Sequence, residues 1–453
     1  MSFPKYPKYK DSGVEWLGEV PEHWRTAPLK AVATHNDEAL DENTPPDEEM
    51  EYVDISSVDG VNGITATETM LFADAPSRAR RRVRHGDVIV STVRAYLRAI
   101  ACIHNPADNL IVSTGFAVVR PRRELVPSFL GHVLSASYFV EQVIARSTGV
   151  SYPAINASEL VGIPVLVPPI DEQNLIAKFL DRETSKIDAL VGEQRRLIEL
   201  LKEKRQAVIS HAVTKGLNPN APLKPSGIEW LGNVPEHWGA EMLLRVTTKI
   251  GNGFVGPTRD ILVENGVPYV QATHVKQGRV NFDGAYFVTP EWAEWQSKAA
   301  LQLDDVLIVQ TGAGTGDIGL VSPDEVGFRC HALIIVRSDT SRLLGSFLSV
   351  ALQSQYGRQT LESIQTGGMH PHLNCGNVKF VFVPLPPTKE QTEIVEHVTE
   401  EAAKFDTLEA EAERAIELLQ ERRTALISAA VTGKIDVRSF SKSSMARLEE
   451  NHD

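Results

Sequence analysis

The chain has 453 residues, of which 42% are hydrophobic and 23% charged, and its formal net charge at pH 7 is −13. This composition is typical of an ordinary soluble protein with two or three domains, and no apolar run reaches the length of a membrane span. Three scattered cysteines form neither a metal-binding pair nor a disulfide framework, and residues 1–10 lack the apolar core of a signal peptide. We therefore expect a cytoplasmic protein that contacts no membrane.

Charge is distributed unevenly along the first third of the chain. Residues 37–51 contain eight acidic residues and no Lys or Arg, whereas residues 78–123 contain ten arginines and two aspartates. Because charge acts locally, the negative total does not exclude nucleic acid as a ligand. A basic surface on an acidic protein suits a DNA-binding protein whose other faces bind protein.

A short arm opens the chain and recurs in its middle. Residues 12–24 read SGVEWLGEVPEHW and residues 226–238 read SGIEWLGNVPEHW, an offset of 214. Gly, Pro and Trp at fixed places favour a turn over a helix. We interpret the tryptophans as anchors that dock each repeat, with base stacking as the alternative. Residues 1–24 are predicted to be an N-terminal arm.

Residues 25–168 are predicted to form the first globular domain, a mixed α/β fold. Short β-branched runs bounded by turn signals indicate strands at 50–58, 87–93, 99–103, 116–119 and 161–167. Apolar periodicity over 125–145 indicates one or two helices, and a polar loop follows at 147–156.

DNA contacts in this domain are expected from the arginine run and from two loops. Five arginines within seven residues exceed what a solvated strand edge, the alternative interpretation, requires, and guanidinium groups suit phosphates and guanine edges. Thr92, Arg94, Tyr96 and Arg98 follow a strand at a spacing of two and so share a face. The predicted DNA-binding residues here are Arg78, Arg80, Arg81, Arg82, Arg84, Thr92, Arg94, Tyr96, Arg98, Thr148, Ser151, Tyr152 and Asn156.

Residues 169–215 are predicted to form one long helix. Apolar residues recur at alternating steps of three and four, which is a heptad seam and requires a partner helix of similar length. At about 1.5 Å per residue this helix is roughly 60 Å long. The predicted seam residues are Ile176, Leu180, Ile187, Leu190, Leu197, Leu201 and Val208.

The second half of the chain repeats this plan. After a linker with the repeated arm at 216–238, residues 239–386 are predicted to form a second domain, with a strand at 305–310 and helices over 343–361. Its polar loop at 365–374 matches 147–156 at an offset of 218. The predicted DNA-binding residues here are Gln310, Thr311, Thr366, His370, His372 and Asn374. Acidic residues outnumber basic ones over 296–341, so we expect the two domains to bind DNA unequally.

Two motifs in this second domain resemble ligand-binding sites, but other interpretations fit them better. The glycines at 314, 316 and 319 match a dinucleotide-binding pattern, but residues 320–323 continue as strand and turn instead of opening a helix. An ordinary hairpin, or a loop whose backbone approaches a ligand, fits better. The histidines at 331, 370 and 372 lack an acidic or thiol partner at ligand spacing, so no metal site is predicted.

Residues 387–433 are predicted to form the partner helix. Adding 218 to the first seam gives the second, and both helices follow a Pro-Pro pair and carry Gln at the fourth place after it. The predicted seam residues are Ile394, Val398, Phe405, Leu408, Ala415, Leu419 and Leu426. Residues 434–453 are polar and are predicted to form a flexible tail.

Taken together, the two WLGxxPxxW arms, the two Pro-Pro-x-x-x-Gln helix starts and the long repeated seams resemble the specificity subunit of type I restriction-modification systems. The resemblance covers about residues 12–432. It implies two target recognition domains that each read half of a split site in double-stranded DNA, separated by an antiparallel coiled coil with pseudo-twofold symmetry. It also implies that two methyltransferase subunits and restriction subunits dock on the chain, which is a monomer acting as a pseudo-dimer. AdoMet, ATP and Mg²⁺ would belong to those partners, and none to this chain.

Other classes of function are weighed against this resemblance. We find no phosphate-binding GxxxxGK[ST], no HExxH and no Asn or Asp followed by Pro-Pro-aromatic, so no catalytic residue is predicted. A stand-alone bivalent DNA-binding or architectural protein would share the duplication and the basic segment. A fused nuclease or methyltransferase would require motifs that the sequence lacks.

Overall fold

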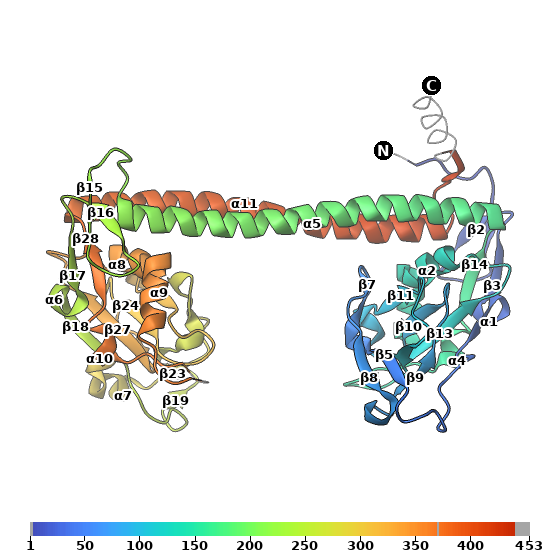
Figure 1. Ribbon diagram of the computed structural model, residues 1–453, viewed down its shortest axis with the longest axis horizontal. Helices are drawn as coiled ribbons and strands as arrows, with labels where there is room; N and C mark the ends of the chain where they lie inside the picture. The colour runs from blue at the N-terminus through green and yellow to red at the C-terminus, as the bar shows by residue number, and fades with distance from the viewer. Residues whose placement is uncertain (1–2, 369–370, 440–453) are drawn as a thin grey trace. The chain divides into compact units, whose positions relative to one another are not determined.

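The structure is a computed structural model that describes residues 3–368 and 371–439. The chain separates into two compact units. Unit 1 consists of Met1–Gln194 with the described part of Glu413–Asp453, and unit 2 consists of Arg195–Ala412. Each unit contains a mixed α/β head and part of each of two long helices, so the predicted fold class is correct (Figure 1).

The two long helices are α5 (Ile170–Lys215) and α11 (Thr388–Val431), and in each unit they lie side by side (Figure 1). Each follows a Pro-Pro pair and has at least one acidic residue in its first turn, where the helix dipole favours negative charge. In unit 1, Ile176 from the start of α5 shares a core with Ala430 from the end of α11. In unit 2, Val213 from the end of α5 shares a core with Ile394 from the start of α11. The helices therefore run antiparallel within each unit.

Burial along the helices corrects part of the predicted seam. The structure buries most of the predicted positions, namely Ile176, Leu180, Ile187, Leu201, Ile394, Val398, Phe405 and Leu426. Val208, Ala415 and Leu419 are half-buried. Leu190, Leu197 and Leu408, however, are 44%, 41% and 44% exposed, so these three predictions are wrong. Val191 and Ile198, 7% and 8% exposed, face inward instead. Every second seam position, namely Thr184, Val191 and Ile198, lies one residue later than predicted, whereas Ile187 and Leu201 keep their predicted places.

The head of unit 1 contains two four-stranded sheets (Figure 1). The first, in spatial order, is β11 (Ile100–Cys102), β10 (Val88–Ser91), β13 (Phe116–Pro121) and β4 (Ala33–His35). The second is β8 (Glu68–Leu71), β5 (Glu49–Val53), β12 (Leu110–Ser113) and β9 (Ala79–Arg82). Smaller pairs are β6 (Val58–Asp59) with β7 (Gly63–Ile64), and β14 (Pro164–Val167) with β3 (Arg25–Pro28).

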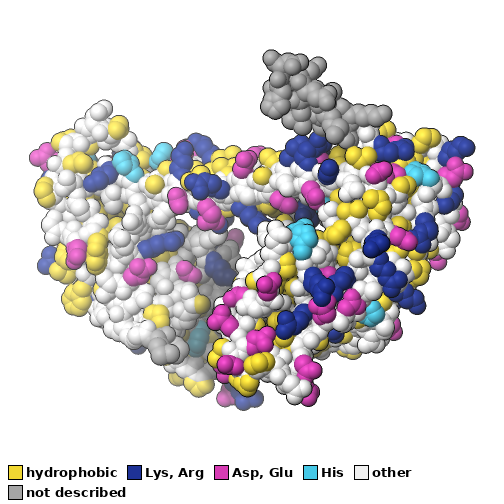
Figure 2. All heavy atoms as spheres, turned by 45° about the vertical axis from the view of Figure 1, so that its right-hand side comes forward, with side chains coloured by type: hydrophobic (Ala, Val, Ile, Leu, Met, Phe, Trp, Pro, Cys, Tyr) yellow, Lys and Arg dark blue, Asp and Glu magenta, His cyan; other side chains and the backbone are white. Residues whose placement is uncertain are grey.

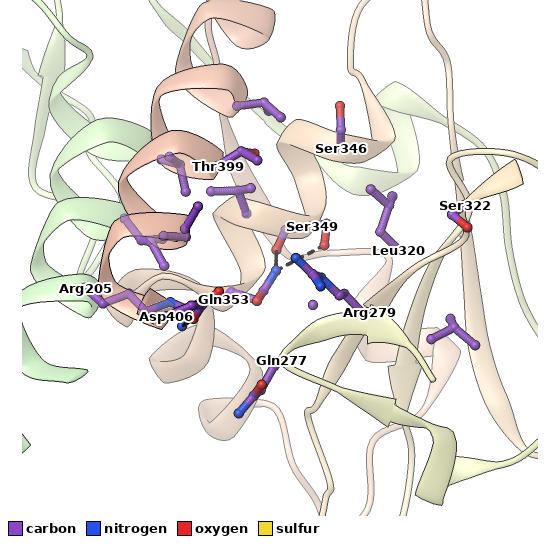
Figure 3. Close-up of a pocket in the computed structure, with 18 of the residues that line it drawn as sticks. Arg205, Gln277, Arg279, Leu320, Ser322, Ser346, Ser349, Gln353, Thr399 and Asp406 are labelled. Atoms are coloured by element: carbon purple, nitrogen blue, oxygen red, sulfur yellow. Dashed lines mark hydrogen bonds and ion pairs between the residues drawn. The ribbon is translucent and has the colours of Figure 1, made fainter. Parts of the chain in front are cut away.

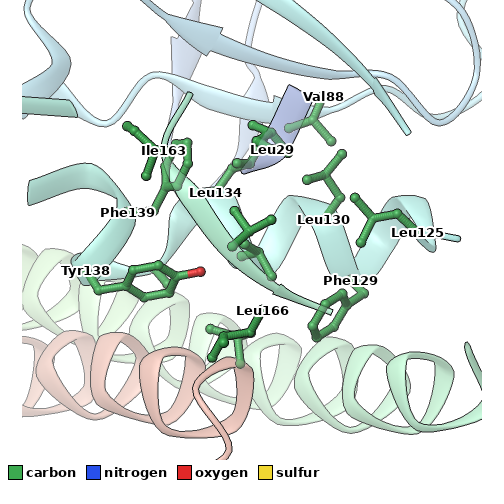
Figure 4. Close-up of a cluster of buried hydrophobic side chains, with 14 of the residues drawn as sticks. Leu29, Val88, Leu125, Phe129, Leu130, Leu134, Tyr138, Phe139, Ile163 and Leu166 are labelled. Atoms are coloured by element: carbon green, nitrogen blue, oxygen red, sulfur yellow. The ribbon is translucent and has the colours of Figure 1, made fainter. Parts of the chain in front are cut away.

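Four helices complete this head: α1 (Leu29–Val32), α2 (Pro127–Ser135), α3 (Ser137–Arg146) and α4 (Ala157–Leu160). Phe129 of α2 and Phe139 of α3 are fully buried in the main core, which also contains Leu166 of β14 and residues of both long helices (Figure 4). One continuous apolar core therefore fixes this head to its helix segments.

The head of unit 2 is built on the same plan with a larger sheet. This sheet is β18 (Thr247–Asn252), β27 (Leu333–Ser338), β24 (Val306–Val309), β25 (Ile318–Leu320), β22 (Gly278–Val280) and β21 (Val275–Lys276). The second sheet is β19 (Leu262–Val263), β23 (Phe287–Val288), β20 (Val267–Val270) and β26 (Arg329–Cys330). β17 (Gly239–Met242) pairs with β28 (Phe382–Leu385). The helices are α6 (Leu243–Val246), α7 (Pro290–Trp295), α8 (Gly345–Gln353), α9 (Gln355–Ser363) and α10 (Cys375–Val378).

The glutamine of each helix start has the same structural role in both units. Gln173 is buried; its Nε2 donates to the carbonyls of Pro168 and Glu124 at 2.8 and 2.9 Å, and its Oε1 accepts the Val126 N–H at 2.8 Å. Gln391 makes the equivalent three bonds to Pro386, Arg342 and Leu344, all at 2.8 Å. These bonds join the start of each long helix to the loop that precedes the head's helix pair.

The arms form short hairpins, β1 (Tyr9–Asp11) with β2 (Glu19–Pro21) and β15 (Leu223–Pro225) with β16 (Asn233–Pro235). Trp24 and Trp238 are buried at the ends of these hairpins, as expected of anchors, whereas Trp16 and Trp230 are 39% and 47% exposed. The predicted flexible tail begins too early at residue 434, because Val437 is buried in the core of unit 1. Residues 440–453 lie outside the described part of the chain. None of the described helices is long and apolar enough to cross a membrane.

Candidate nucleic-acid interface

Two loops of unit 1 that contain predicted DNA-binding residues lie together. We call residues 91–98 and 147–156 loop cluster 1. The Arg94 N–H donates to the Pro153 carbonyl at 2.8 Å, and the Ile155 N–H donates to the Thr92 carbonyl at 2.9 Å. An isolated bridge joins Val93 to Ala154. Backbone bonds therefore hold the two loops in one register.

The side chains of loop cluster 1 combine positive charge with exposed aromatic rings. The guanidinium of Arg94 lies 4.3 Å from the centre of the Tyr152 ring, and its buried Nε has no hydrogen-bond partner among the described residues. Tyr96 is exposed, and Arg98 has a left-handed backbone with φ of 53°. Thr148 and Ser151 are exposed. A cationic, aromatic surface of this kind suits phosphates and stacked bases.

Two predicted residues of this loop cluster have local structural roles. The Thr92 hydroxyl donates to the Gly115 carbonyl at 2.8 Å, which fixes the loop to a neighbouring turn. Asn156 is the N-cap residue of α4, and its N–H donates to Glu159 Oε2 at 3.3 Å. Both residues position the loops; Asn156 is also exposed.

The arginine run lies on and beside edge strand β9, where acidic residues pair with it. Arg84 contacts Glu38 at 2.6 Å and Arg82 contacts Glu48 at 3.4 Å, and both carboxylates come from the acidic segment 37–51. The guanidinium of Arg80 lies 4.8 Å from the Phe72 ring centre, and burial lowers the pKa of Arg81. The run is therefore less basic at its surface than the sequence suggests. Figure 2 shows basic and acidic side chains interspersed on the side of unit 1 that faces the viewer.

Arg120, counted in the basic segment, is part of the internal support of the sheet. Its guanidinium bonds the buried Asp87 carboxylate twice, at 2.8 Å each, and Glu38 at 2.7 Å. The hydrogen bonds to Asp87 and Glu38 raise the pKa of Arg120. In unit 2, Arg337 bonds the buried Asp305 in the same bidentate way, at 2.7 Å.

Unit 2 also brings two predicted loops together, and we call residues 310–317 and 365–374 loop cluster 2. Thr311 bridges His372, and the backbones of Thr366 and His372 exchange two hydrogen bonds of 2.8 and 2.9 Å. The Thr315 hydroxyl donates to the carbonyls of Gly312 and Pro371. As predicted, no helix follows this glycine-rich loop, which leads into β25.

Individual predictions in loop cluster 2 have different outcomes. Gln310 is buried, and its Nε2 donates to Asn252 Oδ1 at 2.9 Å, so it supports the loop. Asn374 caps α10 by accepting the Asn377 N–H at 2.9 Å. Thr311 and Thr366 are exposed and His372 is half-buried. His370 lies outside the described residues.

A hollow in unit 2 separates part of the head from the long helices (Figure 3). Its volume is about 440 Å³, and its lining includes Arg279, Ser349 and Gln353. Gln353 Nε2 donates to the Ser349 carbonyl and hydroxyl at 3.0 and 3.2 Å. Within the described ranges, no three His, Cys, Asp or Glu side chains are grouped so that they could hold a metal ion.

The duplicated geometry corresponds to two matches of one protein family. The model of the family described as "Type I restriction modification DNA specificity domain" matches the chain twice, at residues 22–200 and 248–418. The chain belongs to this family. The specificity protein described here therefore contains two copies of the domain, and each copy includes one loop cluster.

Relatives and solved structures agree with this assignment. The protein is 23% identical to the StySPI specificity subunit of Salmonella potsdam, over 92% of this chain and 90% of the relative. It is 22% identical to the EcoKI specificity subunit of Escherichia coli K12, over the same shares. A structure described as the basis of complex assembly and conformational transition of the type I R-M system matches with a TM-score of 0.72, at 24% identity, over 91% of this chain and 98% of that one. The HsdS subunit of Thermoanaerobacter tengcongensis matches with a TM-score of 0.51, at 24% identity, over 92% and 98%.

Several polar residues at the ends of strands in this specificity protein were not predicted from the sequence. Asp54 and Thr114 in unit 1 follow neighbouring parallel strands, as Gln271 and His331 do in unit 2. The signal available was the repeated Tyr-Val pair at 52–53 and 269–270, which precedes Asp54 and Gln271 at an offset of 217.

Proposed function

We propose that this chain reads an asymmetric, bipartite site in double-stranded DNA for a type I restriction-modification complex. The observation that carries the proposal is the presence of two specificity domains in one chain with unlike loop clusters. Loop cluster 1 presents Arg94, Tyr96 and Arg98, whereas loop cluster 2 presents glycines and threonines. A true twofold dimer reads a palindrome, but two unlike copies in one chain read two unrelated half-sites.

Each part of the chain has its own role in this function. Residues 25–168 and 239–386 are the two target recognition domains, and residues 169–215 and 387–433 are the long helices. Residues 1–24 and 216–238 contain the arms that anchor each repeat. The chain is a monomer that acts as a pseudo-dimer.

We also propose that the long helices dock two methyltransferase subunits, which restriction subunits join. Leu190 in unit 1 and its repeat-related Leu408 in unit 2 are both exposed. Leu418 in unit 1 and its counterpart Leu200 in unit 2 are exposed as well. Large apolar side chains on a solvent-facing helix favour a protein interface. Because each unit has one copy of this pair, two equivalent partners are expected.

Catalysis is assigned to those partners, with AdoMet, ATP and Mg²⁺ bound by them and none by this chain. The test is methylation mapping of host DNA after residues 25–168 are exchanged for those of a relative. We expect one half-site to change and the other to stay. Alteration of both half-sites would contradict the bipartite assignment. Full sequence-specific binding by this chain in cells that lack the partners, with no modification in cells that contain them, would favour a stand-alone DNA-binding protein.

A further inference from the structure

One end of the second sheet in unit 1 connects the arginine run to loop cluster 1. Because β5 and β12 are parallel, Asp54 and the turn at Thr114 follow them at the same edge. The Thr114 N–H donates to the Arg78 carbonyl at 2.7 Å. Gly115, the next residue, accepts both the N–H and the hydroxyl of Thr92 at 2.8 Å. Arg78 is therefore fixed beside the loops that hold Arg94 and Tyr152.

The guanidinium of Arg78 is held from one side. Its Nη2 lies 2.5 Å from Asp54 Oδ2, which also accepts the Tyr52 hydroxyl at 3.1 Å. The other carboxylate oxygen of Asp54 accepts the Ile55 N–H at 2.5 Å. Asp54 is thus fixed by two neighbours, and its side chain is 23% exposed whereas that of Arg78 is 58% exposed. The hydrogen bond to Tyr52 and the charge of Asp54 raise the pKa of Arg78.

This arrangement differs from the contacts of the other arginines in the run. Arg82 and Arg84 pair with residues of the acidic segment, and Arg80 stacks on Phe72. Arg78 pairs instead with a strand-end carboxylate whose own position is fixed, and the Arg78 side chain stays 58% exposed. A guanidinium has five donors in a rigid fork, so contact with Asp54 leaves enough for a bidentate contact elsewhere.

We propose that Arg78 reads a guanine in the half-site of unit 1 and that Asp54 is the positioning residue that orients it; this rests on the function proposed above. Guanine presents O6 and N7 as paired acceptors in the major groove, and an arginine fork matches them. A phosphate would accept an arginine in many orientations, and a fixed orientation would add little. A base edge can be contacted from one direction only, and the contact with Asp54 fixes the guanidinium in one orientation.

Unit 2 has no equivalent of the Arg78–Asp54 contact at the corresponding place. Its parallel strands β20 and β26 end in Gln271 and His331, where unit 1 has Asp54 and Thr114. The Tyr269 hydroxyl, the counterpart of Tyr52, lies 3.1 Å from His331 Nδ1. An amide replaces the carboxylate, so the same device does not orient an arginine there. The effect of Arg78 is therefore confined to one half-site.

The test uses the chain assembled with its methyltransferase partners and maps methylated sites in host DNA. Arg78→Gln and Asp54→Asn are compared with wild type and with Arg25→Gln, a matched control in which an exposed arginine of unit 1 loses its 2.6 Å contact with Glu124. We expect both test variants to relax one guanine position in one half-site by about tenfold or more, the scale of one good bidentate contact. The control should keep the wild-type site.

The outcomes separate the inference from the proposed function. A wild-type complex without any sequence-specific modification would contradict the proposed function. A specific wild-type complex whose Arg78→Gln variant keeps the same site, or loses activity equally on all sequences, would overturn only the guanine assignment. If Arg78→Gln fails to fold, as judged by its thermal midpoint, Asp54→Asn decides by the same criterion, because it keeps the shape of the side chain and removes its charge.

Discussion

Arg423 of α11 donates from Nε to Asp188 Oδ1 of α5 at 2.9 Å inside unit 1. The repeat offset of 218 converts Asp188 into Asp406 and relates Arg205 to Arg423. Arg205 and Asp406 are themselves joined, at 2.5 Å, inside unit 2. Each helix therefore supplies the arginine in one unit and the aspartate in the other. Antiparallel pairing is encoded once in each repeat.

The Arg423–Asp188 pair is expected to stabilise unit 1. Arg423→Met should cost about 1 kcal/mol, near the upper end for ion pairs that keep some exposure, because the Arg423 side chain is only 18% exposed. The measurement is a double-mutant cycle with Asp188→Ala, read from thermal or urea unfolding. Additive effects of the two changes would show that the pair contributes nothing. Arg205→Met, whose partner Asp406 is half exposed, should cost less.

Leu190 and Val191 are neighbours with opposite environments, and aspartate at each should have different effects. Val191→Asp puts a charge into the helix interface and should cost several kcal/mol. Leu190→Asp should leave the thermal midpoint nearly unchanged but weaken co-purification with the methyltransferase. Equal loss of stability in both variants would contradict the seam described here. Unchanged co-purification of Leu190→Asp would remove Leu190 from the proposed docking surface.

The seam shows how far sequence could predict this fold. The long helices and the two α/β heads follow from periodicity and repetition, whereas the antiparallel pairing of the helices was implied by the resemblance to the specificity subunit. The sequence did not predict which face of α5 is buried. Leu190 and Val191 are both apolar, as are Leu197 and Ile198, so two apolar stripes that differ by one residue are possible. The buried stripe passes through Thr184, a polar residue that pattern analysis does not favour. Its hydroxyl is accommodated by donating to the Leu180 carbonyl at 2.7 Å.

The loops of the candidate site could be predicted from the sequence, but the pairing of its charged residues could not. The matched polar loops at 147–156 and 365–374 pointed to both clusters. Pairing of Arg84 with Glu38 depends on residues more than 40 positions apart, which the sheet brings together where Ala39 bridges Arg81. A count of charges along the sequence cannot anticipate such neutralisation. The burial of Gln310 was not anticipated for a similar reason, since its partner Asn252 lies on a strand far away in sequence.

Gln391→Leu should destabilise unit 2 more than its size suggests. The change keeps the volume but leaves the Leu344 N–H and the Arg342 and Pro386 carbonyls without their partner. Buried groups without a hydrogen bond cost about 1–3 kcal/mol each, so a total loss of about 3 kcal/mol or more is expected for the three groups. Gln420→Leu on the exposed part of the same helix is the control. Equal unfolding midpoints for the two variants would contradict this role of Gln391.

Acid should weaken unit 2 through His331. Burial lowers the pKa of His331, and the Tyr269 hydroxyl contacts its Nδ1. Above the unfolded pKa of about 6.5 the imidazole is neutral in both states and contributes no pH dependence. As the pH falls below that value, the unfolded chain takes up the proton first, so the free energy of unfolding decreases. We expect the thermal midpoint to fall between pH 7 and pH 5, and to fall less in His331→Gln. Parallel pH profiles for wild type and variant would show that His331 does not cause the loss.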